Sequence, residues 1–364
     1  MGAAAVPAIA FDGAPRALAR LRANAWRPSR GRILVKLVGA VATIGSVAVI
    51  VATLPFFHRA TLAPLVAHGP TILAIALMLF LVYAVVADGA LDAPQDGLYA
   101  LGAAALGRRC DERALVDFAL TQAIKLYFFT LMLAFLADDI VDFRSLALSS
   151  WSLADPTVVD AANRAIFSLD VAISGMGYLA TLQLCGWHVR APERTLSGWV
   201  ACVVCYEPVY PALATAVFAF DGGDDPGEVM GPGTIAFALW SGLTLLCNAV
   251  YLSATAALGP HFSNLTRRGI VTSGPYRLSK HPAYLAKNAG WWLYWLPAFV
   301  AAGWPEGGRR ALMLAAVSAV YFARAKCEER MLSEDAAYRD YADVIHGRGA
   351  LSRFSALLRR PRAA

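Results

Sequence analysis

The residues best suited to chemistry lie in two short segments near the C-terminus, residues 273–284 and 324–329. They supply two tyrosines, a histidine, an arginine and a glutamate: Tyr276, Tyr284, His281, Arg324 and Glu328. Each segment lies at the end of a long apolar run. Polar side chains are costly to place beside hydrocarbon, so this clustering indicates a site that binds a polar or charged molecule.

The first segment predicts a turn that leads into a helix. Gly274-Pro275 breaks the chain, and the proline of His281-Pro282 is tolerated in a first helical turn. A helix N-terminus offers unpaired N–H groups and partial positive charge, which suit a carboxylate. Tyrosine faces can hold a sulfonium cation or stack on adenine. We therefore expect Tyr276, His281 and Tyr284 to surround one helix N-terminus.

The second segment places Arg324 and Glu328 four residues apart, on one face of a helix. The arginine can grip an anionic substrate through two parallel hydrogen bonds, and the carboxylate can accept from an ammonium or a ribose hydroxyl. The alternative is structural: tyrosines at the membrane interface, Arg277 and Lys280 as markers of the cytoplasmic side, and Arg324 with Glu328 as a surface ion pair.

The order of these residues resembles the isoprenylcysteine carboxyl methyltransferase family of integral-membrane enzymes that use S-adenosylmethionine. The family pattern is a Gly-x-Tyr turn, a basic residue before His-Pro-x-Tyr, an arginine four residues before Glu-Glu-x-x-Leu, and a late Tyr-x-x-Tyr. Here these read Gly274-Pro275-Tyr276, Lys280-His281-Pro282-Ala283-Tyr284, Arg324 before Glu328-Glu329-Arg330-Met331-Leu332, and Tyr338-Arg339-Asp340-Tyr341. The similarity covers residues 260–345.

The resemblance implies an S-adenosylmethionine pocket and a nearby acceptor site. The implied cofactor-binding residues are Tyr276, His281, Pro282, Ala283, Tyr284 and Glu328, with Arg268, Gly269, Ile270, Val271 and His261 at the rim. Arg324 is implied to face the methyl acceptor as the catalytic residue. The chain departs from the pattern at Lys280, where arginine is usual, and at Lys287-Asn288. The Phe-Gly that often precedes the late tyrosines is also absent. Because the cofactor-side residues are retained, these departures affect the identity of the acceptor more than that of the cofactor.

The expected acceptor is lipophilic, such as a prenylcysteine-like or other amphipathic acid. A carboxylate is already a nucleophile at neutral pH, so alignment and desolvation supply most of the rate. A thiol, amine or hydroxyl would need a base, for which His261 and Glu329 are the candidates. The alternatives are a phospholipid N- or thiol S-methyltransferase, and a transporter or scaffold without catalysis.

Composition predicts the elements that position these residues. The chain is 58% hydrophobic and 16% charged, with a mean hydropathy of +0.52, which is too apolar for a soluble protein of 364 residues. We expect an all-α polytopic membrane protein with about eight spans and a catalytic C-terminal helical hairpin with cytoplasmic loops. The expected spans are 37–57, 69–87, 118–137, 171–187, 196–220, 231–260, 283–303 and the short 311–323.

Charge predicts the organisation and the orientation. We expect a basic cytoplasmic leader at 1–36, about five membrane helices in 37–230, and the methyltransferase core with a basic tail in 231–364. Alternate loops are rich in arginine and lysine, which places them and both termini in the cytoplasm, in a bacterial inner membrane. The net charge of +6 then reflects this bias and contact with anionic membrane lipid. No nucleic-acid partner is expected.

Two further features are ambiguous. Glu207 lies within a predicted span, so it either shapes a substrate cavity or pairs with Lys125 or Arg164. The pair Cys202 and Cys205 forms a CxxC with no second pair and no adjacent histidine, so no metal site is expected.

Overall fold

The computed structural model describes residues 27–53, 63, 67–91, 95–145, 151–221 and 225–348, and this part of the chain is almost entirely helical. The α-helices are α2 (Arg30–Thr53), α4 (Gly69–Ala90), α5 (Gly97–Ala105), α6 (Glu112–Ser145), α7 (Pro156–Leu179), α8 (Leu196–Val203), α9 (Val209–Ala216), α10 (Pro226–Val229), α11 (Ile235–Leu258), α12 (Pro282–Ala301), α13 (Glu306–Leu332) and α14 (Ala336–Arg348). Three 3-10 turns are η3 (Gln183–Cys185), η4 (Gly259–His261) and η5 (Gly274–Arg277). Strands β1 (Ala191–Pro192) and β2 (Thr266–Arg267) pair antiparallel.

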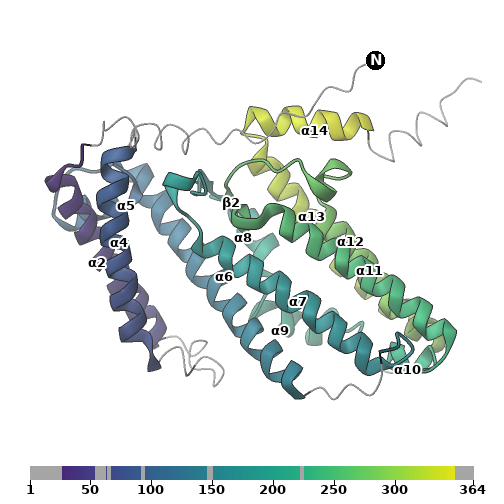
Figure 1. Ribbon diagram of the computed structural model, residues 1–364. Helices are drawn as coiled ribbons and strands as arrows, with labels where there is room; N and C mark the ends of the chain where they lie inside the picture. The colour runs from purple at the N-terminus through teal and green to yellow at the C-terminus, as the bar shows by residue number, and fades with distance from the viewer. Residues whose placement is uncertain are drawn as a thin grey trace, which may run out of the picture.

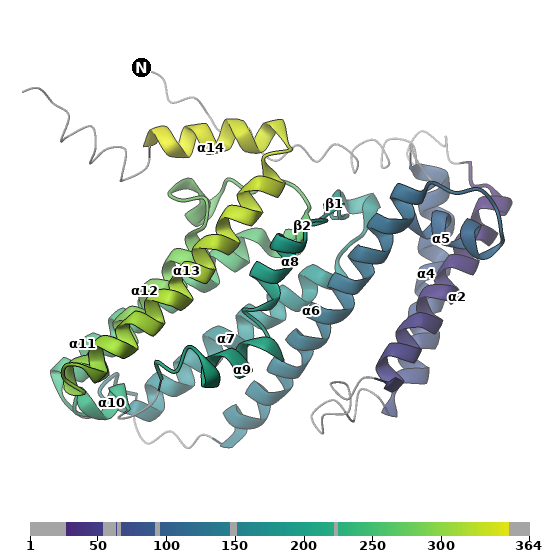
Figure 2. The same cartoon turned by 180° about the vertical axis from the view of Figure 1, so that it is seen from behind.

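The long helices run between two ends of the molecule. The start of α2, the connection between α4 and α6, both strands and α14 lie at one end (Figures 1 and 2). The far ends of α6 and α13 and the short helix α10 lie at the other. The basic loops predicted to share one side therefore gather at one end, to the extent that they are described. Residues 1–26 and 349–364, which include most of the predicted leader and the tail, lie outside the described residues.

Among the described residues, three helices have the length and apolar composition of membrane spans: α2, α4 and α11, the last continued to His261. The described residues are almost entirely helical, which confirms the predicted helical fold. The three apolar helices indicate a membrane protein. The count of eight spans stays a prediction. Helices such as α6 and α13 also run the length of the molecule, but their ends carry many charged residues, which lower their average hydropathy.

The predicted span at 196–220 is wrong as one continuous helix. The structure has α8 and α9 instead, separated by residues 204–208. Pro208 explains the break, because proline lacks an N–H donor and disfavours helical geometry in the residue before it. Pro211 follows inside α9, where its missing N–H falls within the first turn.

The other predicted spans correspond to helices with different bounds; for example, the stretch 118–137 lies within α6, which has 34 residues. The helix predicted at 171–187 is α7, which begins at Pro156 and ends at Leu179. Its start is set by Asp155, whose side chain accepts a hydrogen bond from the Thr157 N–H, and an uncharged stretch alone could not reveal this cap. The short stretch 311–323 is the middle of α13, a 27-residue helix that continues through the charged residues 324–330.

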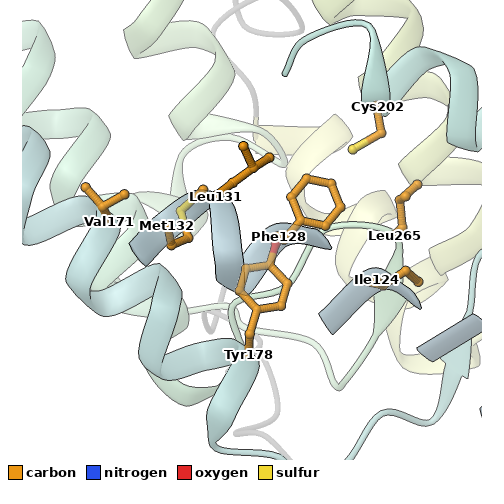
Figure 3. Close-up of a cluster of buried hydrophobic side chains, with 8 residues drawn as sticks. All are labelled: Ile124, Phe128, Leu131, Met132, Val171, Tyr178, Cys202 and Leu265. Carbon is orange, nitrogen blue, oxygen red and sulfur yellow. The ribbon is translucent and has the colours of Figure 1, made fainter. Parts of the chain in front are cut away.

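A buried cluster joins α6 and α7 to the loop that precedes β2. It consists of Ile124, Phe128, Leu131, Met132, Val171, Tyr178, Cys202 and Leu265 (Figure 3). The rings of Phe128 and Tyr178 stack with centroids 5.6 Å apart. The Tyr178 hydroxyl then accepts a hydrogen bond from the backbone N–H of Asn264, at 3.1 Å. The cluster therefore fixes the loop around Asn264 against the helices.

The N-terminal helices α2 and α5 pack closely through glycine. A Cβ atom added to Gly39 would collide with the Leu98 carbonyl oxygen, and one added to Gly102 would collide with that of Val35. Small residues allow helix backbones in a membrane to approach in this way. Arg32 also pairs with the buried Asp88 of α4, at 2.9 Å, which ties α2 to the end of α4.

Candidate functional site

The two sequence segments that carry the polar residues meet at one end of α12 and α13. His281 is the residue that precedes α12, and Pro282 and Tyr284 lie in its first turn. Arg324 and Glu328 lie in the last turns of α13, which packs against α12. Helix α14 holds the loop that precedes α12. The Tyr341 hydroxyl donates to the carbonyl oxygens of Tyr276, at 2.7 Å, and Ser279, at 3.2 Å.

Glu328 links the two segments directly. Its carboxylate accepts a hydrogen bond from the Tyr284 hydroxyl and, at 3.3 Å, one from Arg324 Nε. His281 Nδ1 lies 3.8 Å from the other carboxylate oxygen, and the His281 and Tyr284 rings stack with centroids 5.5 Å apart. The expected grouping of tyrosine, histidine and glutamate around one helix N-terminus is therefore present.

Arg324 is buried, so it is not part of a surface ion pair. Only 3% of its surface is exposed. Its guanidinium donates to Asn264 Oδ1 at 2.7 Å, and its central carbon lies 5.3 Å from the Tyr206 ring centroid and 5.0 Å from that of Tyr284. Aromatic faces and two oxygen acceptors thus surround this cation, which holds it in one orientation.

The second glutamate, Glu329, connects the loop to α13 on the outer side of the site. It accepts from Lys280 at 2.6 Å, from His281 Nε2 at 3.3 Å and from Lys326 at 2.9 Å. The hydrogen bond from His281, followed by those from the two lysines, holds the pKa of the Glu329 carboxyl well below its usual range. Glu329 is therefore ionised and engaged at neutral pH, which makes it a poor general base.

A partly enclosed cavity of about 170 Å³ lies between these elements. Nine of the predicted site residues line it: His261, Arg268, Gly269, Tyr276, His281, Ala283, Tyr284, Arg324 and Glu328. The structure therefore brings together most of the residues that the sequence pattern selected.

Four predicted site residues do not line this cavity: Pro282, Ile270, Val271 and Glu207. Pro282 is buried at the start of α12, and Val271 is 6% exposed. Ile270 packs against a cluster of α14 side chains, formed by Tyr338, Tyr341 and Ile345. These three residues therefore surround the site without facing the cavity.

Glu207 lies at the break between α8 and α9. Its carbonyl oxygen accepts a hydrogen bond from Tyr127, at 2.5 Å. The two partners considered for its side chain have other contacts: Lys125 donates to Thr181 at 2.8 Å, and Arg164 pairs with Asp142 and Asp160. The structure thus gives no support to either predicted pair.

Arg268 has a structural role that the sequence did not reveal. It is 3% exposed, and its guanidinium donates to the carbonyl oxygens of Gly177, Ala180, Trp187 and Phe262. Burial lowers its pKa to about 10, so it remains charged at neutral pH. Arg268 therefore satisfies the carbonyl groups at the end of α7 and fixes the part of the cavity wall that it forms.

Several cavity residues were missed as site residues: Tyr206, Tyr251, Asn264, Lys287 and Tyr321. The tyrosines lie in apolar helices or at their ends, where they are typical of ordinary packing. Asn264 belongs to none of the motifs on which the predicted site rests. Lys287 carried a signal, because it is an ionisable residue inside an apolar run.

Lys287 differs from Arg324 in its surroundings. Its ammonium lies 5.2 Å from the Trp291 ring centroid, 5.5 Å from that of Tyr251 and 5.7 Å from that of Tyr321. No carboxylate of the described residues lies within ion-pair distance of it. Asp170 of α7, which is buried and accepts from the Tyr251 hydroxyl at 2.8 Å, interacts with Lys287 electrostatically from beyond that distance.

Within the described residues, no group of histidine, cysteine and carboxylate side chains is placed to hold a metal ion. Comparison of the chain with known protein families, with curated proteins and with solved structures found no match. The function must therefore be argued from the residues of the site.

Proposed function

We propose that this protein is an integral-membrane methyltransferase of the isoprenylcysteine carboxyl methyltransferase type, which uses S-adenosylmethionine to methylate a lipophilic acceptor. The observation that carries the proposal is the convergence of two distant segments on one cavity. The Tyr284 hydroxyl donates a hydrogen bond to Glu328, 44 residues further along the sequence, and Arg324 donates one to the same carboxylate. A fold that used these residues only as interface markers would not need to bury them together.

The chemistry of the cavity wall suits each part of the cofactor. Glu328 can accept from an ammonium or a ribose hydroxyl, and the helix N-terminus at His281 can donate to a carboxylate. The Tyr276 and Tyr284 rings can stack on adenine or face a sulfonium. S-adenosylmethionine supplies an activated methyl group when it is bound.

Binding requires some movement of the site. A cavity of about 170 Å³ is smaller than the ~300–1,000 Å³ typical of ligand pockets. Both hydrogen bonds to Glu328 fall on Oε1, so Oε2, which lies 3.8 Å from His281 Nδ1, is left to accept from the ligand. The protein contacts hold the carboxylate in place before the ligand arrives, which lowers the entropy lost on binding.

Two cations line the cavity on the acceptor side, the buried Arg324 and the partly exposed Lys287. Arg324 has its own partners in Asn264 and Glu328, whereas Lys287 faces the cavity without a carboxylate partner. Lys287 is thus the better-placed group to bind an anionic acceptor, with Arg324 beside it to orient the reacting end. A carboxylate acceptor needs no proton transfer, which is consistent with a site whose closest carboxylates are both engaged.

A phospholipid N-methyltransferase or a thiol S-methyltransferase would use the same cofactor wall but would need a proton acceptor. His261, whose Nδ1 lies 3.2 Å from the Arg268 carbonyl oxygen, is the nearest candidate. A transporter or scaffold would not need a cofactor at all. Measurement of cofactor binding separates the last class from the others, and an acceptor panel separates the methyltransferases.

Calorimetry on the detergent-purified protein tests the proposal. We expect S-adenosylmethionine and its demethylated product to bind, and Glu328→Gln to weaken binding by about tenfold to a hundredfold, as for the loss of a charge-assisted hydrogen bond. Glu228→Gln, on exposed α10 at the other end of the bundle, is the matched control and should bind normally. Failure of the unsubstituted protein to bind either compound would refute the proposal.

A further inference from the structure

A second and larger cavity, of about 590 Å³, lies between the N-terminal helices and α6. Its walls come from α2 and α4 on one side, from α6 on another, and from the η3 and β1 region at its upper end. In Figure 1, α2 and α4 stand apart from α6 below the level of α5. The cavity shares no lining residue with the one at His281.

The lower part of this cavity is apolar. Its lining residues there include Ala40 and Ile44 of α2 and Leu73, Ala76 and Leu77 of α4. Both helices are candidate membrane spans. A hydrocarbon chain that enters from the surrounding bilayer would therefore meet mainly apolar side chains along this wall, where the hydroxyl of Thr43 already donates to the Gly39 carbonyl oxygen.

The upper part of the cavity is polar, and one of its cations, Lys125, has no carboxylate partner among the described residues. The lining acids already have partners: Asp96 pairs with Lys36 at 3.0 Å, and Asp117 forms two hydrogen bonds with Arg194. Lys125 donates only to the Thr181 hydroxyl, at 2.8 Å, and no carboxylate of the described residues lies within ion-pair distance of it.

Two more lining groups point to an anionic ligand. His188 has a buried Nδ1 with no hydrogen-bond partner. Arg190 pairs with Asp335 at 3.6 Å, but its side chain is 35% exposed, so it can also reach an anion. An ammonium whose one partner is a hydroxyl, and a buried imidazole nitrogen with no partner, are poorly compensated until a ligand satisfies them.

We propose that this cavity binds an anionic phospholipid of the bilayer. The phosphate group would lie at Lys125 and His188, and an acyl chain would lie along Leu73, Ala76 and Leu77. The charge of the upper wall selects the anionic headgroup, and the apolar lower wall selects a membrane lipid over a soluble phosphate compound. Such a lipid would fill the space between α2–α4 and α6 and hold the two groups of helices together. The inference does not depend on methyl transfer.

Native mass spectrometry of the detergent-purified full chain tests this site. Phosphatidylglycerol and phosphatidylcholine with identical acyl chains are the probes, and we expect phosphatidylglycerol to bind more tightly. Lys125→Gln should reduce phosphatidylglycerol binding by about tenfold or more, because it removes a charge-assisted hydrogen bond, and should abolish the preference. Arg164→Gln, which removes a cation that pairs with Asp142 and Asp160, should leave the preference intact.

A second pair of variants tests the apolar part and does not depend on how well Lys125→Gln folds. Ala76→Trp should fill the cavity and reduce the binding of both lipids. Ile75→Trp, on the same helix but outside the cavity, should not, because Ile75 is already exposed on the surface of α4. Equal binding of the two lipids by the unsubstituted protein, or unimpaired lipid binding by Ala76→Trp, would overturn the proposal.

Discussion

At the scale of single residues, the site contains two cations with different partners, Arg324 and Lys287. The Arg324 guanidinium is fixed by Asn264 and Glu328, so a change at Arg324 alters the cofactor side as well as the acceptor side. Lys287 lies among three aromatic rings and has no such partner. The proposed function therefore assigns acceptor binding more specifically to Lys287 than to Arg324.

Substitution of Lys287 by methionine tests this division of roles. For an acidic acceptor such as a prenylcysteine analogue or a long-chain fatty acid, we expect KM to rise about tenfold, because a charged contact is lost while side-chain volume is kept. Cofactor affinity should stay within about threefold, which corresponds to less than ~1 kcal/mol. Arg324→Lys should instead weaken cofactor binding and lower kcat, since lysine lacks the planar fork that reaches both Asn264 and Glu328.

These values are measured by transfer of a labelled methyl group to each acceptor and by calorimetry with the cofactor. A phosphatidylethanolamine or hydrophobic thiol acceptor serves as the comparison, because neither presents a carboxylate. An unchanged KM for every acid in Lys287→Met would remove Lys287 from the acceptor site.

At the scale of secondary-structure elements, the loop before α12 is held against α13 and α14. Glu329 on α13 accepts hydrogen bonds from Lys280 and His281 of the loop, and Tyr341 on α14 donates to two loop carbonyl groups. The sequence motif identified these residues, but the spacing alone could not show that Glu329 faces the loop while Glu328 faces the cavity. Adjacent residues on a helix point about 100° apart, so one motif supplies both a binding group and a structural support.

The variant Glu329→Gln tests this support and its dependence on pH. The pKa of Glu329 is lowered in the folded protein, mainly by His281 and Lys280, so ionised Glu329 stabilises the fold above its unfolded pKa of about 4.3. That stabilisation is lost as the pH falls through the folded pKa. At pH 7 we expect Glu329→Gln to reduce stability by about 1–2 kcal/mol. The difference from the unsubstituted protein should shrink steadily below about pH 4.

Thermal unfolding in detergent across this pH range provides the measurement, with Glu334→Gln as the matched control. Glu334 is exposed and lies 3.8 Å from Arg267, so its replacement should change little at any pH. A difference between Glu329→Gln and the unsubstituted protein that stayed constant from pH 7 down to pH 3 would contradict the assignment.

At the scale of the whole molecule, the two ends of the bundle differ in charge. The end with α14 carries Arg190, Arg267 and Lys280, whereas α10 and the far end of α6 carry acidic groups such as Asp142 and Glu228. Basic loops favour the cytoplasmic side of a membrane. We propose that the site end faces the cytoplasm of a bacterial cell, with both termini there, where a soluble cofactor can reach the cavity.

Cysteine labelling in a variant without the six native cysteines tests this orientation. We expect Ser273→Cys, in the loop beside the site, to resist a membrane-impermeant maleimide in intact cells and to react in inverted vesicles. Glu228→Cys on α10 should react from outside, because both positions are exposed at opposite ends of the bundle. The reverse pattern would place the cofactor cavity away from the cytosolic supply and would contradict the proposed orientation.

The sequence by itself predicted a helical membrane protein and nine of the residues that line the main cavity. Apolar runs of about 20 residues have few alternatives to helices, and local motifs such as His281-Pro282 mark where a helix begins. It failed at residues 196–220, where a proline breaks the helix, and at the start of α7, which a single cap defines. Such local signals are weaker than the hydropathy around them.

Only the tertiary structure decided which residues meet. Arg324 donates hydrogen bonds to Asn264, 60 residues away in the sequence, and to Tyr206, 118 residues away. No periodic pattern predicts contacts at those separations. The same holds for the second cavity, whose walls come from α2, α4, α6 and the η3 region. Local spacing limits the face of a helix on which a side chain can lie, whereas packing between distant segments determines what it contacts and which cavities remain.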